Sequence, residues 1–65
     1  MKMNLSIEWW EKNEDTEGIE ETHKEQLNLH GVERAAEMME QGYVEGELHQ
    51  EIEGVYYDGY WNSKA

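Results

Sequence analysis

Apolar and polar residues alternate along the start of the chain. The apolar set, which would share one side of an extended chain, is Met3, Leu5, Ile7 and Trp9. The residues between them include Glu8 and Trp10 and would lie on the opposite side. Alternation of this kind is typical of a strand with one buried face. The pattern therefore predicts a half-buried strand over residues 2–10.

The alternation returns over residues 46–62, around the dipeptide Glu53-Gly54. A two-residue hairpin loop at this dipeptide would place a largely apolar set of facing residues on one side of the hairpin. These pairs are Ile52 with Val55, Gln50 with Tyr57, Leu48 with Gly59, and Gly46 with Trp61. The other side would pair Glu51 with Tyr56, His49 with Asp58, and Glu47 with Tyr60. A slip of one residue would exchange the two sides, so this separation favours the register. The two glycines are expected to make room for Trp61 and Leu48.

Between these segments the apolar period becomes helical. At 100° per residue, one arc collects Leu27, Gly31, Val32, Ala35, Met38 and Met39, and the opposite side carries Glu33, Glu37 and Glu40. Thr22 followed by Glu25 matches a capping box, and Gly42 stands where a left-handed helix terminator is expected. The pattern predicts a helix over residues 23–41. Gly31 either allows close approach of the sheet or breaks the helix in two, and we favour the unbroken helix.

These segments predict one small α+β domain over residues 1–65, in the order β-α-β-β, with one helix on a three-stranded, mainly antiparallel sheet. Residues 11–21 hold six acids and are expected to be a flexible, solvated connection. The last strand suits the centre of the sheet because it contains Tyr and Trp but no Lys or Glu. Three glutamates would guard the edge beside it: Glu47, Glu51 and Glu53. The first strand is then expected to be antiparallel to the last.

The net charge of the chain indicates which classes of partner it can bind. Sixteen Asp and Glu residues oppose five Lys and Arg residues, which gives a formal net charge of −11 over 65 residues. Such a charge repels nucleic acid and anionic membranes and attracts basic protein surfaces. The chain has no cysteine, so it has neither disulfides nor thiolate zinc ligands, and we expect a reducing cytoplasm. The apolar runs are too short for a membrane span or a signal peptide.

Two surfaces are candidates for partner binding. The first is the acidic helix side with Glu33, Glu37 and Glu40, whose Cβ atoms would lie about 5 to 6 Å apart. That spacing is comparable to the spacing of charges along a nucleic-acid strand. The second is the sheet face turned away from the helix, where aromatic residues lie within an acidic rim typical of protein-binding patches. Its candidate residues are Trp10, Tyr56, Tyr60, Glu47, Glu51 and Asp58.

Catalytic, cofactor and metal sites find little support in the sequence. His23 and His30 are seven residues apart, which separates them by about 10 Å along a helix, too far to share a metal. His49 is expected to face Asp58, but no Ser, Cys or Lys is placed nearby as a nucleophile. The acidic run over residues 14–21 lacks the ligand pattern of a calcium loop. We expect no catalytic residues, no cofactor and no metal, and therefore no enzymatic activity.

The carboxyl-terminal third of the chain carries a resemblance. The segments 42–48, 52–54 and 57–61, with the sequences GYVEGEL, IEG and YDGYW, resemble the endings of small proteins carried by phages and mobile elements. Together with its size and acidity, the chain is similar to anti-CRISPR proteins, in particular inhibitors of type I-C systems. The resemblance implies binding to a subunit of the interference complex and blocking of target DNA, without enzymatic activity. It assigns no contact residue.

Two hypotheses follow for function. In the first, a non-enzymatic inhibitor presents its carboxylates as a DNA mimic to a basic, DNA-binding surface of a host defence complex. In the second, an adaptor or steric inhibitor docks through Trp10, Tyr56 and Tyr60, and acidity serves mainly to steer the encounter. Either way the expected partner is a basic protein, with no direct contact to nucleic acid or membrane. The expected state is a monomer or a weak homodimer.

Overall fold

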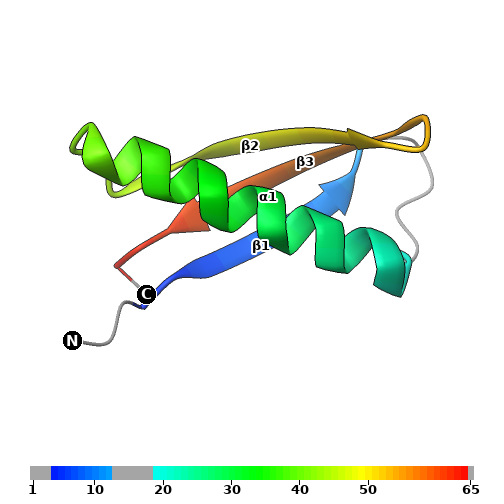
Figure 1. Cartoon of the computed structure of the whole chain (residues 1–65), viewed down its shortest axis with the longest axis horizontal. Coiled ribbons are helices and arrows are strands. Elements are labelled where there is room, and N and C mark those ends of the chain that lie inside the picture. Colours follow the sequence, from blue (N-terminus) through cyan, green and yellow to red (C-terminus); the bar gives the residue numbers. More distant parts are fainter. Residues whose placement is uncertain (1–3, 13–18, 65) are drawn as a thin grey trace.

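The computed structural model describes residues 4–12 and 19–64. Within these ranges the chain forms β1 (Ser6–Glu11), α1 (Glu21–Glu40), β2 (Glu45–Ile52) and β3 (Val55–Asn62). The three strands form an antiparallel sheet in the order β1-β3-β2, and α1 lies across one face of it (Figure 1). The predicted α+β fold with β-α-β-β order is confirmed, as is the central position of the last strand.

The predicted hairpin register is confirmed at every pair. Ile52 faces Val55, and the pairing continues from there to Gly46 and Trp61 on the buried side and to Glu47 and Tyr60 on the other. Both residues of the loop have positive φ, 50° at Glu53 and 80° at Gly54. Two positive φ values are the signature of a type I′ turn, whose twist matches that of the strands it joins.

Two backbone contacts define which residues of each ladder are hydrogen-bonded. The Ser63 N–H donates to the Val44 carbonyl, and the Lys12 N–H donates to the Tyr56 carbonyl, each at 2.9 Å. Facing residues of an antiparallel pair alternate between bonded and non-bonded pairs. The odd-numbered residues of β3 therefore bond to β2, and its even-numbered residues bond to β1. Both edges of β3 are thus fully paired.

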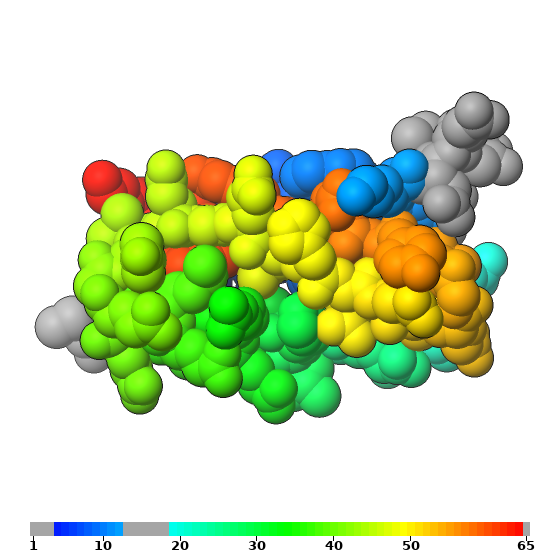
Figure 2. All heavy atoms as spheres, turned by 90° about the horizontal axis from the view of Figure 1, so that it is seen from above, coloured from blue at the N-terminus to red at the C-terminus, as the bar shows by residue number. Residues whose placement is uncertain are grey.

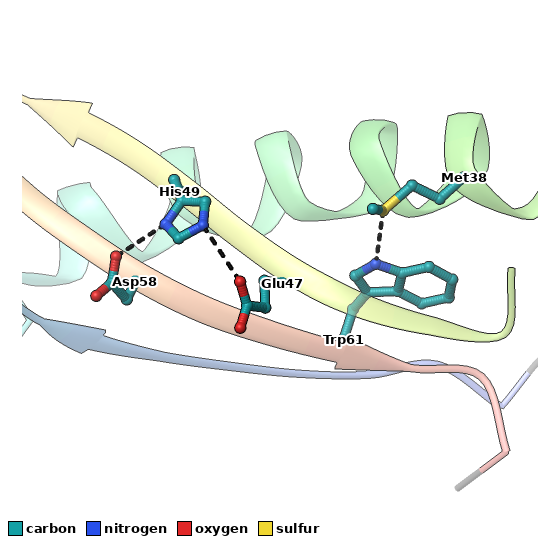
Figure 3. Close-up of polar contacts among 5 residues, drawn as sticks. All are labelled: Met38, Glu47, His49, Asp58 and Trp61. Atoms are coloured by element: carbon teal, nitrogen blue, oxygen red, sulfur yellow. Dashed lines mark hydrogen bonds and ion pairs between the residues drawn. The ribbon is translucent and has the colours of Figure 1, made fainter.

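The core lies between α1 and the sheet and consists of two adjoining clusters. Leu27 packs with Ile52 and Tyr57, and Ala35 packs with Leu48 and Trp61. Trp9 from β1 contacts both clusters and joins them. The Trp61 indole N–H also donates to the Met38 sulfur at 3.0 Å (Figure 3), which satisfies the one polar group of this otherwise apolar side chain.

Glycines allow the close packing of this core. A Cβ on Gly31 would lie 3.1 Å from Ile7, so the unbroken helix uses this residue to approach the sheet, as predicted. A Cβ on Gly46 would lie 2.7 Å from the Trp61 indole nitrogen, which confirms the role expected for this glycine. Gly59 was expected to make room for Leu48, which faces it, but the side chain nearest to it is that of Trp9. The ring of Trp9 occupies the space above Gly59, at 2.7 Å from a would-be Cβ.

The helix start differs from the prediction. The capping box was wrong, because α1 begins at Glu21 and Thr22 already lies inside its first turn. Glu20 occupies the cap position and makes no side-chain cap bond among the described residues. Ile19, directly before the cap, packs against the Leu27 cluster, and His23 is anchored to the sheet. These tertiary contacts start the helix at Glu21, two residues before the position that the local sequence predicts.

The helix end agrees with the prediction to within one residue. Gly42 has φ 95°, and the N–H groups of Gly42 and Tyr43 donate to the carbonyls of Met39 and Met38 at 3.0 and 3.1 Å. This pattern is the Schellman motif. The prediction that Val32 belongs to the packing arc was wrong, because this side chain is 49% exposed. Leu27, Gly31 and Ala35 define the packed stripe instead, together with His23.

The segment between β1 and α1 is shorter than predicted. Glu11 belongs to β1, and Glu21 belongs to α1. Of the predicted flexible connection, Lys12, Ile19 and Glu20 are also described, and residues 13–18 lie outside the described residues, as do Lys2 and Met3 of the predicted first strand.

His23, considered above only as a metal ligand, is a buried polar residue whose place in the core the sequence analysis did not predict. Its Nε2 lies 2.8 Å from the Glu53 carboxylate, and its Nδ1 lies 2.5 Å from the Tyr57 hydroxyl. A carboxylate can only accept, so Nε2 donates to Glu53, and Nδ1 is the hydrogen-bond partner of the Tyr57 hydroxyl. These contacts attach the start of α1 to the tip of the β2–β3 hairpin.

Replacing Tyr57 by Phe should therefore destabilise the protein. The change leaves the Nδ1 atom of buried His23 without its partner, which costs about 1 to 3 kcal/mol. Chemical denaturation measures the free energy of unfolding. The matched control is Tyr56→Phe at the exposed neighbouring position, where we expect a change below about 0.5 kcal/mol. Equal stability of the two variants would contradict the role of the His23 contact.

Candidate protein-binding surface

The sheet face turned away from α1 carries most of the predicted partner-binding residues. We call it the open face, and it consists of Ser6, Glu8, Trp10, Glu45, Glu47, His49, Glu51, Tyr56, Asp58, Tyr60 and Asn62. Each of these residues is exposed or half-buried. The period-two pattern of the strands places them together, because alternate residues share one face.

The register sets which open-face residues are neighbours. One row across the sheet contains Trp10, Asp58 and His49, and the next contains Glu8, Tyr60 and Glu47. The predicted set of Trp10, Tyr56, Tyr60, Glu47, Glu51 and Asp58 is thus brought onto one surface. Trp10 and Tyr56 are 47% and 55% exposed, which is unusual for large aromatic side chains and leaves their rings accessible to a partner.

His49 lies in the middle of the acidic side chains of this face. Its Nδ1 is 2.9 Å from Asp58 and its Nε2 is 3.8 Å from Glu47 (Figure 3). The predicted contact between His49 and Asp58 is confirmed. The His49 ring is 66% exposed, so the contact with Asp58 is open to solvent and resembles a surface pair more than a sequestered catalytic dyad.

The carboxylates of the open face raise the pKa values of two phenols. Hydrogen bonding toward the Glu51 carboxylate, followed by the charge of that carboxylate, favours the protonated phenol and raises the pKa of Tyr56 above its usual 10. Glu45 raises the pKa of Tyr60 in the same way, with burial adding and Asn62 opposing. The two tyrosines are therefore held beside different carboxylates.

The acidic side of α1 is the second predicted surface. Glu33, Glu37 and Glu40 are all exposed. Arg34 donates to Glu37 at 2.8 Å, an exposed pair of the i,i+3 type. The structure thus leaves Glu33 and Glu40 free of ion pairs with the described basic residues and partly neutralises Glu37. The sequence spacing of Arg34 and Glu37 could have indicated this pair.

Over the described residues, Arg34–Glu37 is the only ion pair in which a Lys or Arg meets a carboxylate. Within residues 4–12 and 19–64, His49 is the one basic side chain within salt-bridge distance of the open-face glutamates and Asp58. Most of the negative charge is therefore exposed and not compensated within the fold.

Residues 4–12 and 19–64 contain no group of three His, Cys, Asp or Glu side chains placed to hold a metal ion. The one helix described, α1, is not apolar enough to cross a membrane.

Comparison with known proteins gave no relatives. No protein-family model matches the chain, and no curated protein or solved structure is significantly similar to it.

Because each tyrosine has its own carboxylate, removing one carboxylate should change the pKa of one tyrosine only. Glu51→Gln should lower the pKa of Tyr56 and leave that of Tyr60 unchanged, whereas Glu45→Gln should do the reverse. NMR titration of the tyrosine ring carbons measures both values in each variant. A shift of both tyrosines by either substitution would contradict the assignment of partners.

The same pKa directions predict how stability depends on pH. Tyr56, Tyr57 and Tyr60 all have raised folded-state pKa values, and for buried Tyr57 desolvation is the largest cause. Their contribution is complete below the unfolded-state pKa of about 10 and is lost as the pH rises through the folded-state values. The free energy of unfolding should therefore fall above about pH 10, and less so in Tyr57→Phe than in the parent protein.

Proposed function

We propose that this protein is a non-enzymatic inhibitor that binds a basic, nucleic-acid-binding surface of a protein and excludes DNA from it. The observation that carries the proposal is the uncompensated charge of a rigid surface, in which a single Lys or Arg ion pair is found among the described residues. Alternate residues of a strand lie about 6.6 Å apart, and successive phosphates of a DNA strand carry one charge per about 3.4 Å. Carboxylates on neighbouring strands of the open face, and separately those along α1 on the opposite side of the molecule, therefore each offer a row of charges that a phosphate-binding groove can accept.

The target class comes from the resemblance to anti-CRISPR proteins. Subunits of an interference complex hold DNA in positively charged channels, and such a channel is the kind of surface that a polyanionic protein can occupy. The bacterial cytoplasm is the compartment in which this encounter would take place.

A second candidate function is favoured by a specific observation on the open face. Trp10 and Tyr56 expose about half of their surface, and aromatic residues of this kind supply much of the energy of protein interfaces. In this case the protein docks through its aromatic residues and blocks the partner sterically, while the carboxylates accelerate the encounter.

Competition with DNA tests the leading proposal. The tagged protein is used to capture its partner from a lysate of a bacterial host with an active interference complex. Added duplex DNA should release the captured protein, and elution should require only moderate salt, because exposed charge pairs are screened. Capture that resists both DNA and salt would overturn the proposal that carboxylates occupy a DNA-binding surface.

Two sets of variants separate the surfaces. One set replaces Glu33, Glu37 and Glu40 by Lys on α1, and the other replaces Tyr56 and Tyr60 by Ala on the open face. Under the leading proposal, the Lys set should reduce binding at least tenfold and the Ala set only a few fold. The reverse order would favour aromatic docking. Circular dichroism controls for folding, and Glu20, Glu21 and Glu25 changed together to Lys provide a charge-matched control at the start of α1.

A further inference from the structure

The free edge of β2 joins the backbone and the acidic side chains in one surface. β2 is an edge strand, since the sheet order is β1-β3-β2. Viewed from the β2 side, its residues lie at the surface alongside α1 (Figure 2). The ladder with β3 uses the backbone groups of Gly46, Leu48, Gln50 and Ile52, as established by the Val44–Ser63 bond and by the type I′ turn.

The remaining backbone groups of β2 therefore point away from the sheet. They belong to Glu45, Glu47, His49 and Glu51, whose side chains all lie on the open face. A strand that pairs with this edge would form hydrogen bonds with the same residues whose side chains it meets. The other edge, on β1, differs: its outward backbone groups belong to Ile7, Trp9 and Glu11, two of which bury their side chains partly under α1.

We propose that the β2 edge accepts an extended basic segment of the partner protein as an additional antiparallel strand. The proposal rests on the proposed function, because it takes the partner to be a basic protein. In an added strand the residues facing Glu47, His49 and Glu51 project onto the open face with the same spacing of about 7 Å. A segment with Lys or Arg at every second position places each cation beside an open-face carboxylate.

The open face also has space for these cations. Two shallow hollows flank His49, one lined by Glu51, Tyr56 and, at its far side, Lys12, and the other by Glu47, Tyr60 and Trp10. Each combines a carboxylate with an aromatic ring, and a guanidinium group can pair with the first and stack on the second. Charge and ring together favour Arg over Lys in the added strand.

A second copy of this chain fits the edge less well. Self-pairing of two β2 strands centred on His49 would oppose Glu47 of each copy to Glu51 of the other. Like charges directly opposite each other destabilise a strand pair, and acidic residues on an edge are a known device against such self-association.

The test uses synthetic peptides in which Arg alternates with Thr, titrated into the full chain at low ionic strength. Two peptides of equal composition and charge carry backbone N-methyl groups, on the Arg residues in one and on the Thr residues in the other. Antiparallel pairing needs the N–H groups of the Arg residues, which face Glu47, His49 and Glu51. Methylation of Arg should weaken binding at least tenfold relative to methylation of Thr.

Hydrogen exchange provides a direct readout on the protein. In the free protein the N–H groups of Glu47, His49 and Glu51 should exchange fast, and peptide binding should slow them at least tenfold. The N–H groups of Leu48 and Gln50 already bond to β3, and their exchange rates should not change.

A matched pair of variants tests the outward N–H directly. Glu47→Pro and Glu47→Gln lose the same charge, but only Glu47→Pro also loses an outward N–H, and it should bind the peptide more weakly.

The outcomes distinguish this inference from the proposed function. Equal affinity of the two methylated peptides, without new protection in β2, would overturn the strand addition and leave the polyanionic surface intact. Absence of binding by either peptide would overturn the strand addition, and resistance of the captured partner to DNA would separately overturn the proposed function. Protection of the β2 amides that depends on protein concentration, without peptide, would show that a second copy occupies the edge and would also overturn the inference.

Discussion

Hydrogen bonding along both edges of β3 is the constraint on which the rest of this structure depends. Its odd-numbered residues bond to β2 and its even-numbered residues bond to β1. The same parity buries Tyr57 and Trp61 beneath α1 and places Tyr56, Asp58 and Tyr60 on the open face. Backbone pairing, core packing and the composition of the exposed surface are therefore fixed together. A one-residue shift at the Glu53-Gly54 turn would break all three.

The net charge of −11 is compatible with folding because the acids lie outside this framework. The described glutamates of α1 and of the open face are exposed, and the buried polar residue of the core, His23, is held by Tyr57 and Glu53. Self-repulsion thus acts across solvent, where it is screened. Glu53 also occupies a position of positive φ that glycine or asparagine would suit better, and its contact with His23 gives a reason for a glutamate there.

The fold was largely predictable from the sequence because its elements have clear periods. The facing pairs around Glu53-Gly54 followed from the separation of apolar and polar residues, and the central position of β3 followed from its lack of Lys and Glu. The start of α1 was not predictable in the same way. Thr22 and Glu25 match a local cap, but contacts of Ile19 and His23 with distant residues extend the helix. The burial of His23 and the packing of Trp9 over Gly59 likewise depend on three-dimensional proximity.

The residues of the candidate surface were predictable from the sequence, but the hydrogen bonding of its backbone was not. Alternation placed Trp10, Tyr56 and Asp58 on one face, but it carried no information on which backbone groups of β2 remain unpaired. That property required the hydrogen-bond parity of the whole sheet. The pairing of Arg34 with Glu37 shows a related gap, since spacing permits such a contact without deciding whether a side chain makes it.

The division of labour within β2 has a consequence for how this protein can evolve. Its even-numbered residues maintain the architecture, whereas Glu45, His49 and their odd-numbered neighbours contribute neither to the hydrophobic interior nor to the backbone hydrogen bonds with β3. Because these side chains are exposed, we expect substitutions there to change the free energy of unfolding by less than about 0.5 kcal/mol. The residues exposed on this face can therefore vary while the even-numbered residues of β2 keep the fold.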